Sequence, residues 1–299
     1  MRVNFARLIL MCLGWFGLSS PTLAEAIHQE KSLYRNIVVN ESNGRRCLLF
    51  TVKRGDRNQT CLDLRNPRRL VFPYVRMTLG GLLLSPEPSK VLVIGLGGGS
   101  IPVALNEMYP EATIDVVEID EAVVKVAKRY FNFVENEHLK VHVADARVYT
   151  KRAALQGKRY DMIILDAFTG DYIPEHLMTR EYLEETRALL ESPGILIANT
   201  FSTSDLYDHE SVTYTEVFGP FFNFKMPNTG NRVVISSSEA LPSDFVLRSR
   251  AKRLSARLQT YGVDVEVFPQ YMRRGVDWDI TKRSLTDQYS PANLLRSDS

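Results

Sequence analysis

Cysteine is scarce in this chain, and long apolar or charged runs are missing. Three cysteines among 299 residues are too few for a scaffold held together by disulfides. No run reaches the ~20 apolar residues of a membrane-spanning helix, and the five histidines show no spacing typical of a metal site. The formal net charge is only +2, which argues against a nucleic-acid-binding surface. There is no internal repeat, and 44% hydrophobic residues suffice for one main domain with an appendage.

Residues 1–24 have the order of an export signal. Two arginines precede the apolar run Leu8–Phe16, and the small residues Thr22 and Ala24 stand where a signal peptidase needs them. Cleavage after Ala24 is therefore expected, with the mature chain periplasmic or secreted. An uncleaved start on a cytoplasmic chain is the alternative. Cleavage would remove two arginines and no acid, so the mature net charge would be zero.

Export would leave Cys47 and Cys61 as the cysteines of the mature chain. They lie in two expected strands around a turn at Arg54-Gly55-Asp56. Two cysteines that face each other across a hairpin can form a disulfide in an oxidising compartment. Two buried free thiols are the alternative. We expect the disulfide in the exported form.

Short β-branched runs alternate with helical stretches from residue 91 onward. Helices such as Ile101–Met108 and Ala122–Phe131 are expected between the strands, which are Val91–Ile94, Thr113–Val117, Lys140–Val143, Met162–Leu165 and Ile195–Asn199. This alternation predicts an α/β fold with a Rossmann-like, doubly wound parallel sheet. Such sheets bind ligands beyond the carboxyl ends of their strands.

The chain divides into four expected parts. Residues 1–24 are the signal peptide, and 25–80 form an N-terminal β-strand domain with a linking helix. Residues 81–240 form the Rossmann-like nucleotide-binding catalytic domain. Residues 241–299 supply a C-terminal amphipathic helix, expected over Asp244–Tyr261, and a tail. We expect this last part to pack on the sheet and close the crevice.

The sequence VLVIGLGGGS runs from a buried strand directly into a glycine loop. Gly95, Gly97 and Gly99 let the backbone turn tightly into the next helix and approach a ligand closely. The dinucleotide fingerprint requires a further glycine where Ser100 stands, which disfavours NAD. A tight turn without a ligand is the structural alternative.

Acids follow the next strands, at the edge where the crevice is expected. Glu118 can accept both ribose hydroxyls of a nucleoside, whereas Asp120 is expected to cap the following helix. Asp145 can accept a hydrogen bond from an adenine amino group, with Ala146 against the ring. Asp166 stands where the crevice is deepest, and a helix or turn cap is its alternative role. The acids after the second and third strands together favour an adenosyl ligand.

The segment from about Ser32 to Ser238 resembles the polyamine aminopropyltransferase family, the spermidine synthases and their relatives. SLYRNIVVNES resembles the family's N-terminal hairpin, VLVIGLGGGS its nucleotide loop, VVEID its ribose acid and DAR its adenine acid. YDMIILDAF resembles the strand with its catalytic aspartate, and SLTDQYSPANLL the tail of a divergent, spermidine-synthase-like branch. The resemblance implies a class I methyltransferase-type fold with a small N-terminal β-hairpin domain.

This resemblance implies a transferase that moves an aminopropyl group from decarboxylated S-adenosylmethionine to a polyamine or another amine. The donor is a co-substrate, and no tightly bound cofactor is expected. Asp166 matches the family's proton acceptor, and the acids after the second and third strands match those that hold the nucleoside. Gln59 matches a glutamine that touches the nucleoside, and Tyr74 matches a tyrosine at the start of the family's first helix.

The chain departs from the family where the family grips amines. Gly98 stands in place of an aspartate that holds the aminopropyl amine, so Gly98→Asp is expected to improve affinity for the decarboxylated donor. A second family acid is Thr169 here, and Asp171 is its expected substitute. Further acids predict a rim suited to a cationic substrate, and these are Glu175, Asp205, Asp208 and Glu210.

Two other functions stay open on the sequence. Methyl transfer from S-adenosylmethionine uses the same fold. Many such methyltransferases carry an acid where Val93 stands, which argues against methyl transfer here. The glycine at position 98, in place of the family's aspartate, argues for methyl transfer. A non-catalytic exported protein that binds nucleosides or polyamines is the third, since adenosyl donors are made in the cytoplasm. The expected partner is a small-molecule amine rather than nucleic acid, with a homodimer as a further option.

Overall fold

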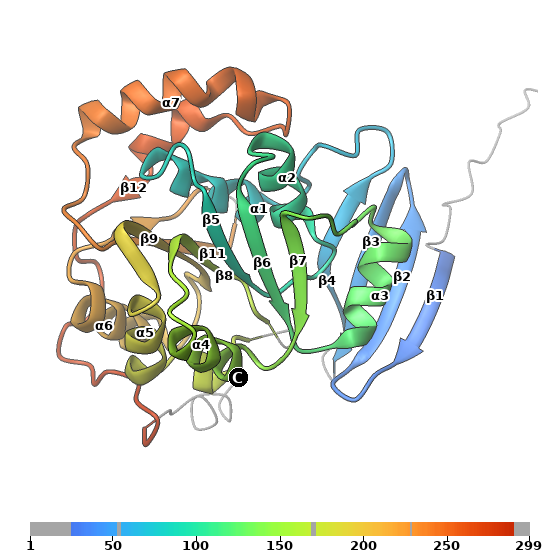
Figure 1. The fold of residues 1–299 in the computed structure, drawn as a ribbon, viewed down its shortest axis with the longest axis horizontal. Coiled ribbons are helices and arrows are strands. Elements are labelled where there is room, and N and C mark those ends of the chain that lie inside the picture. The colour runs from blue at the N-terminus through green and yellow to red at the C-terminus, as the bar shows by residue number, and fades with distance from the viewer. Residues whose placement is uncertain (1–24, 53–54, 169–171, 228, 290–299) are drawn as a thin grey trace, which may run out of the picture.

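Two β-sheets and a set of helices make up the chain (Figure 1). The computed structural model describes residues 25–52, 55–168, 172–227 and 229–289. The expected signal segment 1–24, Thr169 and Asp171 therefore lie outside the described residues. Within that part of the chain, no helix is both long and apolar enough to cross a membrane.

The N-terminal sheet is antiparallel and has the order β1-β2-β3-β4. Its strands are β1 (Glu25–Lys31), β2 (Asn36–Ser42), β3 (Arg45–Val52) and β4 (Gly55–Asp63). Pairing of β3 with β4 continues as far as Val52 and Gly55, so Gly55 and Asp56 belong to a strand and not to the expected turn. Cys47 pairs directly with Cys61, and the structure joins them in a disulfide, as expected.

The central sheet has the order β12-β10-β11-β9-β8-β5-β6-β7. Its strands are β5 (Lys90–Ile94), β6 (Thr113–Glu118), β7 (Leu139–Val143), β8 (Tyr160–Leu165), β9 (Leu190–Phe201), β10 (Phe222–Phe224), β11 (Asn231–Ser237) and β12 (Met272–Arg273). The five strands β5 to β9 are parallel, and antiparallel strands extend the β9 edge. Each expected strand is present, and the doubly wound sheet is confirmed.

Helices cover both faces of this sheet. They are α1 (Pro73–Thr78), α2 (Ser100–Met108), α3 (Glu121–Tyr130), α4 (Ala146–Leu155), α5 (Arg180–Arg187), α6 (Tyr207–Phe218) and α7 (Asp244–Gln259). One apolar core joins the sheet to α1, α2 and α7, and another joins it to α4, α5 and α6. Because both faces are covered, the parallel strands are continuous apolar runs rather than alternating ones.

Helix α3 links the two sheets. Val124 and Ala127 on one side belong to the core of the central sheet. Val123 and Val126 pack instead against apolar residues of β2 and β3. Helix α3 thereby packs against both sheets and holds the N-terminal sheet beside the central one (Figure 1).

The described part of the C-terminal segment, residues 241–289, packs on the sheet as expected, but no residue of this part lines the cavity at the strand ends, so here it does not close the crevice. Leu247 and Leu258 of α7 are fully buried in the core that also contains Phe268. Arg250 donates hydrogen bonds to two backbone carbonyls of the segment after α1. The apolar side of α7 is therefore buried against one face of the sheet. Strand β12 pairs with β10 and extends the edge of the sheet.

Candidate active site

A cavity of about 190 Å³ opens at the carboxyl ends of β5, β6, β7 and β8. Strand β5 lies between β6 and β8, so the chain reverses its winding direction at this point. Doubly wound sheets bind ligands at such a switch point. The cavity brings together eight of the predicted site residues: Gln59, Tyr74, Gly95, Gly97, Glu118, Asp145, Ala146 and Asp166.

The glycine loop forms the inner edge of the cavity. Gly95 has φ of 99°, and a side chain there would clash with the backbone carbonyl of Asp166. Glycine at this position lets the loop lie directly against the end of β8. Gly99 differs from the expectation because it faces Phe133 instead of the cavity, and it caps the start of α2.

Glu118 is buried and held by the backbone on both sides. Its Oε2 accepts a hydrogen bond from the Leu96 amide at 3.1 Å, and its Oε1 accepts one from the Asp120 amide at 3.0 Å. Burial raises the pKa of the Glu118 carboxyl, and the two amide hydrogen bonds oppose this rise. Each oxygen keeps a lone pair for a ligand hydroxyl. Asp120 is the predicted cap of α3 and accepts from the Ala122 amide.

Asp145 has two structural partners. Its Oδ1 caps α4 by accepting from the Val148 amide at 3.0 Å. Its Oδ2 lies 3.2 Å from Nε2 of His176, a residue of the segment after β8 that also lines the cavity. His176 therefore stands next to the carboxylate that the sequence assigns to the adenine amino group.

Asp166 is half-buried at the end of β8. Asn199 of β9 donates a hydrogen bond from Nδ2 to Asp166 Oδ1 at 2.8 Å. Removal from water raises the pKa of the Asp166 carboxyl to about 7, while the bond from Asn199 favours the ionised form. Burial and the nearby Asp166 charge also hold the pKa of the Tyr74 hydroxyl well above its usual value. A carboxyl with a pKa close to neutrality can both accept and release a proton.

Arg35 is a cavity residue that sequence reasoning missed. Its side chain is only 11% exposed and comes from the turn between β1 and β2. The guanidinium lies over the ring of Phe50 and donates to the carbonyl of Phe168 at 3.1 Å. Its Nε stands 3.5 Å from Asp120 Oδ2. Arg35 thus connects the N-terminal sheet with the ends of β6 and β8.

Three missed residues stand inside segments that the sequence had already marked. Arg35 lies in the SLYRNIVVNES motif, His176 in the segment after the fourth predicted strand, and Asn199 is the last residue of the fifth. Asn199 could have been recognised as a site residue because it is a polar residue at the end of a predicted parallel strand. Nothing local signals the contact of Arg35 with Phe168, because 133 residues separate them.

The prediction that Glu210 belongs to an acidic rim of the crevice is wrong. This residue is buried and its Oε2 accepts a hydrogen bond from Arg232, also buried, at 2.8 Å. Glu210 lies on the buried side of α6 together with Ser211 and Tyr214, and its pairing with Arg232 compensates for the burial of its charge. The carboxylate therefore neutralises a core arginine and does not face a substrate.

The expected gain in donor affinity on Gly98→Asp is overturned, because neighbouring side chains fill the space beside Gly98. A side chain at Gly98 would clash with Cγ2 of Thr60, and its Cβ would lie 3.1 Å from the ring of Phe131. Thr60 is buried, and its Oγ1 makes a hydrogen bond with Ser100 at 3.2 Å. Thr60 therefore occupies the room that the family's aspartate would need.

We now expect Gly98→Asp alone to destabilise the fold by about 1–3 kcal/mol, as overpacking does. The change Thr60→Ser removes Cγ2 and keeps the hydroxyl bonded to Ser100. Calorimetry with the decarboxylated donor should show higher affinity for the double variant than for either single variant. Equal affinity of Gly98→Asp with and without the serine would contradict this steric explanation.

The sheet order, the glycine loop and the acids at the strand ends define a class I methyltransferase-type protein. The model of the spermine/spermidine synthase domain matches residues 74–228. A polyamine aminopropyltransferase of Vibrio vulnificus is 54% identical over 292 residues, which cover 96% of each chain. The chain belongs to the spermine/spermidine synthase family.

Two more distant similarities concern the fold and the sequence. A probable spermidine synthase from Corynebacterium glutamicum shares the fold with a TM-score of 0.64 at 20% identity, over 86% of this chain and 98% of that one. An eEF1A lysine and N-terminal methyltransferase of Xenopus laevis is 29% identical over 83% of this chain, which spans 34% of that protein. The sequence similarity thus extends to a methyltransferase.

Proposed function

We propose that this protein transfers an aminopropyl group from decarboxylated S-adenosylmethionine to an amine, as a polyamine aminopropyltransferase. The observation that carries the proposal is Asp166, a half-buried carboxyl with a pKa near neutrality at the switch point of the sheet. Glu118 and Asp145 stand along the same cavity, where a nucleoside would place its ribose and its adenine. The 54% identity to a polyamine aminopropyltransferase supports the same reaction.

Asp166 supplies the proton acceptor that this reaction needs. A polyamine is protonated at neutral pH, and its nitrogen has no free electron pair for attack. The Asp166 carboxylate holds the ammonium and accepts its proton as the new carbon–nitrogen bond forms. The carbon–sulfur bond breaks at the same time, and its electron pair stays on sulfur, which leaves as the neutral thioether methylthioadenosine. Asn199 keeps the carboxylate oriented through its hydrogen bond.

Calorimetry with three ligands tests this proposal. We expect methylthioadenosine and the decarboxylated donor to bind, and the decarboxylated donor to be consumed when an amine is added. Binding and turnover of intact S-adenosylmethionine, with a methylated product, would replace the proposal by methyl transfer. Binding of nucleosides without turnover of either donor would indicate a non-catalytic binding protein.

The acidic limb of the pH profile should report Asp166. Since the ionised carboxylate is the active form, kcat/KM for the donor should fall tenfold per pH unit below about 7. Asn199→Ala removes the hydrogen bond that favours ionisation. The pKa of Asp166 should therefore rise, and the limb should move to higher pH by about one unit. The amine titrates identically in both proteins, so coincident profiles would contradict this assignment.

We also propose that the protein is exported and that its mature chain begins near Glu25. The arginine, apolar and small-residue order of residues 1–24 supports this. The Cys47–Cys61 disulfide supports it too, because disulfides persist in oxidising compartments. N-terminal sequencing of the protein from fractionated native cells should begin near Glu25 in the extracytoplasmic fraction. An intact Met1 in the cytoplasmic fraction would refute export.

A further inference from the structure

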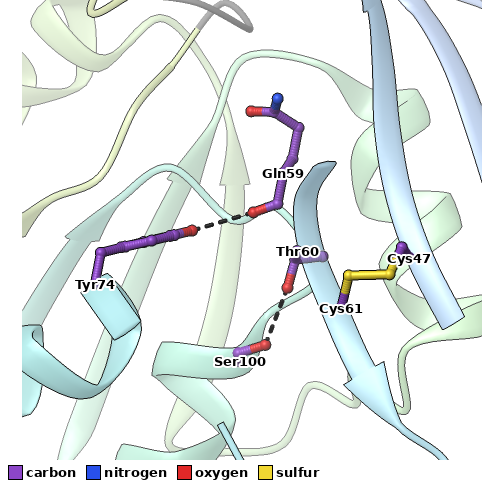
Figure 2. Close-up of a disulfide and its surroundings, with 6 residues drawn as sticks. All are labelled: Cys47, Gln59, Thr60, Cys61, Tyr74 and Ser100. Carbon is purple, nitrogen blue, oxygen red and sulfur yellow. Dashed lines mark hydrogen bonds between the residues drawn. A yellow bond between two sulfur atoms is a disulfide. The ribbon is translucent and has the colours of Figure 1, made fainter. Parts of the chain in front are cut away.

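Strand β4 runs between the cavity and the disulfide. Gln59 and Thr60 line the cavity, and the next residue, Cys61, is bonded to Cys47 of β3 (Figure 2). Consecutive side chains of a regular strand point to opposite faces. Gln59 and Thr60 are neighbours in β4 and both line the cavity, and the alternation of the strand is broken at this point.

A β-bulge at Gln59 provides this break. Leu48 of β3 pairs with Thr60, whereas Leu49 pairs with Asn58, so the register shifts here and Gln59 is the extra residue of β4. Such a bulge bends the strand and changes the direction of the side chain. The Gln59 carbonyl accepts a hydrogen bond from the Tyr74 hydroxyl at 3.1 Å (Figure 2). Tyr74 thus holds the backbone of β4 at the bulge.

The other side of the bulge is held by covalent and polar contacts. Cys47 and Cys61 form the pair next to Leu48 and Thr60, with their Cα atoms 4.1 Å apart. The Thr60 hydroxyl reaches Ser100, the first residue of α2 after the glycine loop, at 3.2 Å (Figure 2). The disulfide, the bulge and the glycine loop are therefore joined in one continuous set of contacts.

We propose that the Cys47–Cys61 disulfide is a positioning element of the nucleoside site. A disulfide requires Cα atoms within about 7 Å of each other and Cβ atoms that point toward each other, so it excludes a shift of one residue between β3 and β4, which would place the two sulfurs on opposite faces. A shift of one residue would turn every side chain of β4 to the other face. By fixing the register one pair away from the bulge, the disulfide keeps Gln59 and Thr60 on the cavity wall. This inference rests on the proposed function in one respect, namely that the ligand is an adenosyl nucleoside.

Reduction should therefore weaken nucleoside binding. A dithiol passes two electrons and two protons to the bond, which leaves two cysteine thiols, and the dithiol itself becomes a cyclic disulfide. The β3–β4 ladder then loses its covalent restraint beside the bulge. The Tyr74 and Ser100 hydrogen bonds remain, so the site should loosen without being lost.

The test measures methylthioadenosine affinity by calorimetry on the oxidised protein and on three variants. The double variant Cys47→Ala/Cys61→Ala removes the disulfide, and Tyr74→Phe removes the hydroxyl bonded to the bulge. Each should raise Kd by roughly three- to tenfold, the size of one net hydrogen bond. Val39→Ala is the matched control, because this fully buried residue of β2 stabilises the same sheet without lining the cavity. Its Kd should stay within twofold of the wild type despite a lower stability.

Reduction of the wild-type protein by dithiothreitol gives a second measurement that needs no substitution. Its Kd should rise as in the cysteine variant, and reoxidation should restore it, with circular dichroism showing a folded chain throughout. Unchanged affinity in the reduced protein and in the cysteine variant overturns this inference alone. Unfolding on reduction also overturns it, because the disulfide would then serve folding and not the site. A wild-type protein that does not bind methylthioadenosine overturns the proposed function as well.

Discussion

Asp166→Asn should lower aminopropyl transfer by roughly 10²–10⁴-fold and leave methylthioadenosine affinity within a few-fold of the wild type. The asparagine keeps the size of the side chain but cannot accept the ammonium proton. The nucleoside contacts assigned to Glu118 and Asp145 are untouched by the change. Single-turnover transfer with the decarboxylated donor, together with calorimetry on the product nucleoside, would measure the two effects separately.

An exposed aspartate offers a matched control for this experiment. Asp264 lies outside the cavity, and its side chain caps no helix. Asp264→Asn makes the same chemical change and should leave both transfer and affinity unaltered. A transfer rate of Asp166→Asn equal to that of the control would remove Asp166 from the mechanism. A parallel loss of nucleoside affinity would instead assign Asp166 to binding.

Arg232→Met should destabilise the protein by about 3–5 kcal/mol, because it leaves the Glu210 carboxylate buried without its partner. Arg232 is completely buried and donates to Glu210, Ser211 and Thr200. Its guanidinium also lies over the ring of Tyr207. Urea denaturation at pH 8 would measure the loss in free energy of unfolding.

The pH dependence of this loss has a definite sign. Burial raises the pKa of Glu210 from 4.5 to about 7 in the intact pair, and removal of Arg232 takes away a group that lowers it. A carboxyl with a raised folded-state pKa stabilises the protein at low pH, and that contribution disappears as the pH rises through the folded pKa. The loss caused by Arg232→Met should therefore be smaller at pH 5 than at pH 8.

Two further variants make the buried-pair prediction specific. Arg180→Met breaks ion pairs with Glu181, Glu184 and Glu216, all of them exposed or partly exposed, and it should cost no more than about 1 kcal/mol. The double variant Arg232→Met/Glu210→Leu removes both buried charges and should recover much of the lost stability. A cost for Arg232→Met as small as that of Arg180→Met would show that the buried pair contributes little.

The sequence was sufficient to predict the parallel sheet and the polar residues at the carboxyl ends of its strands. Apolar runs and helical stretches are local patterns, and each expected parallel strand is present. The carboxyl ends of parallel strands share one edge, so Glu118, Asp145 and Asp166 could be expected in one cavity before any contact was known. The hairpin that carries Cys47 and Cys61 could also be expected from local spacing, whereas the sequence left a disulfide and two free thiols open until the structure paired the cysteines.

Only the tertiary structure could decide the contacts that join distant segments. Arg35 reaches the segment after Asp166 because α3 holds the N-terminal sheet against the sheet edge. The sequence predicted room for an acid beside Gly98, but Thr60 fills that space. It also predicted an exposed charge at Glu210, but this residue points into the core and binds Arg232. These outcomes depend on strand register and on packing between elements far apart in the chain. Local periodicity specifies which face of an element is apolar, but it carries no information about which distant side chain will occupy the space opposite.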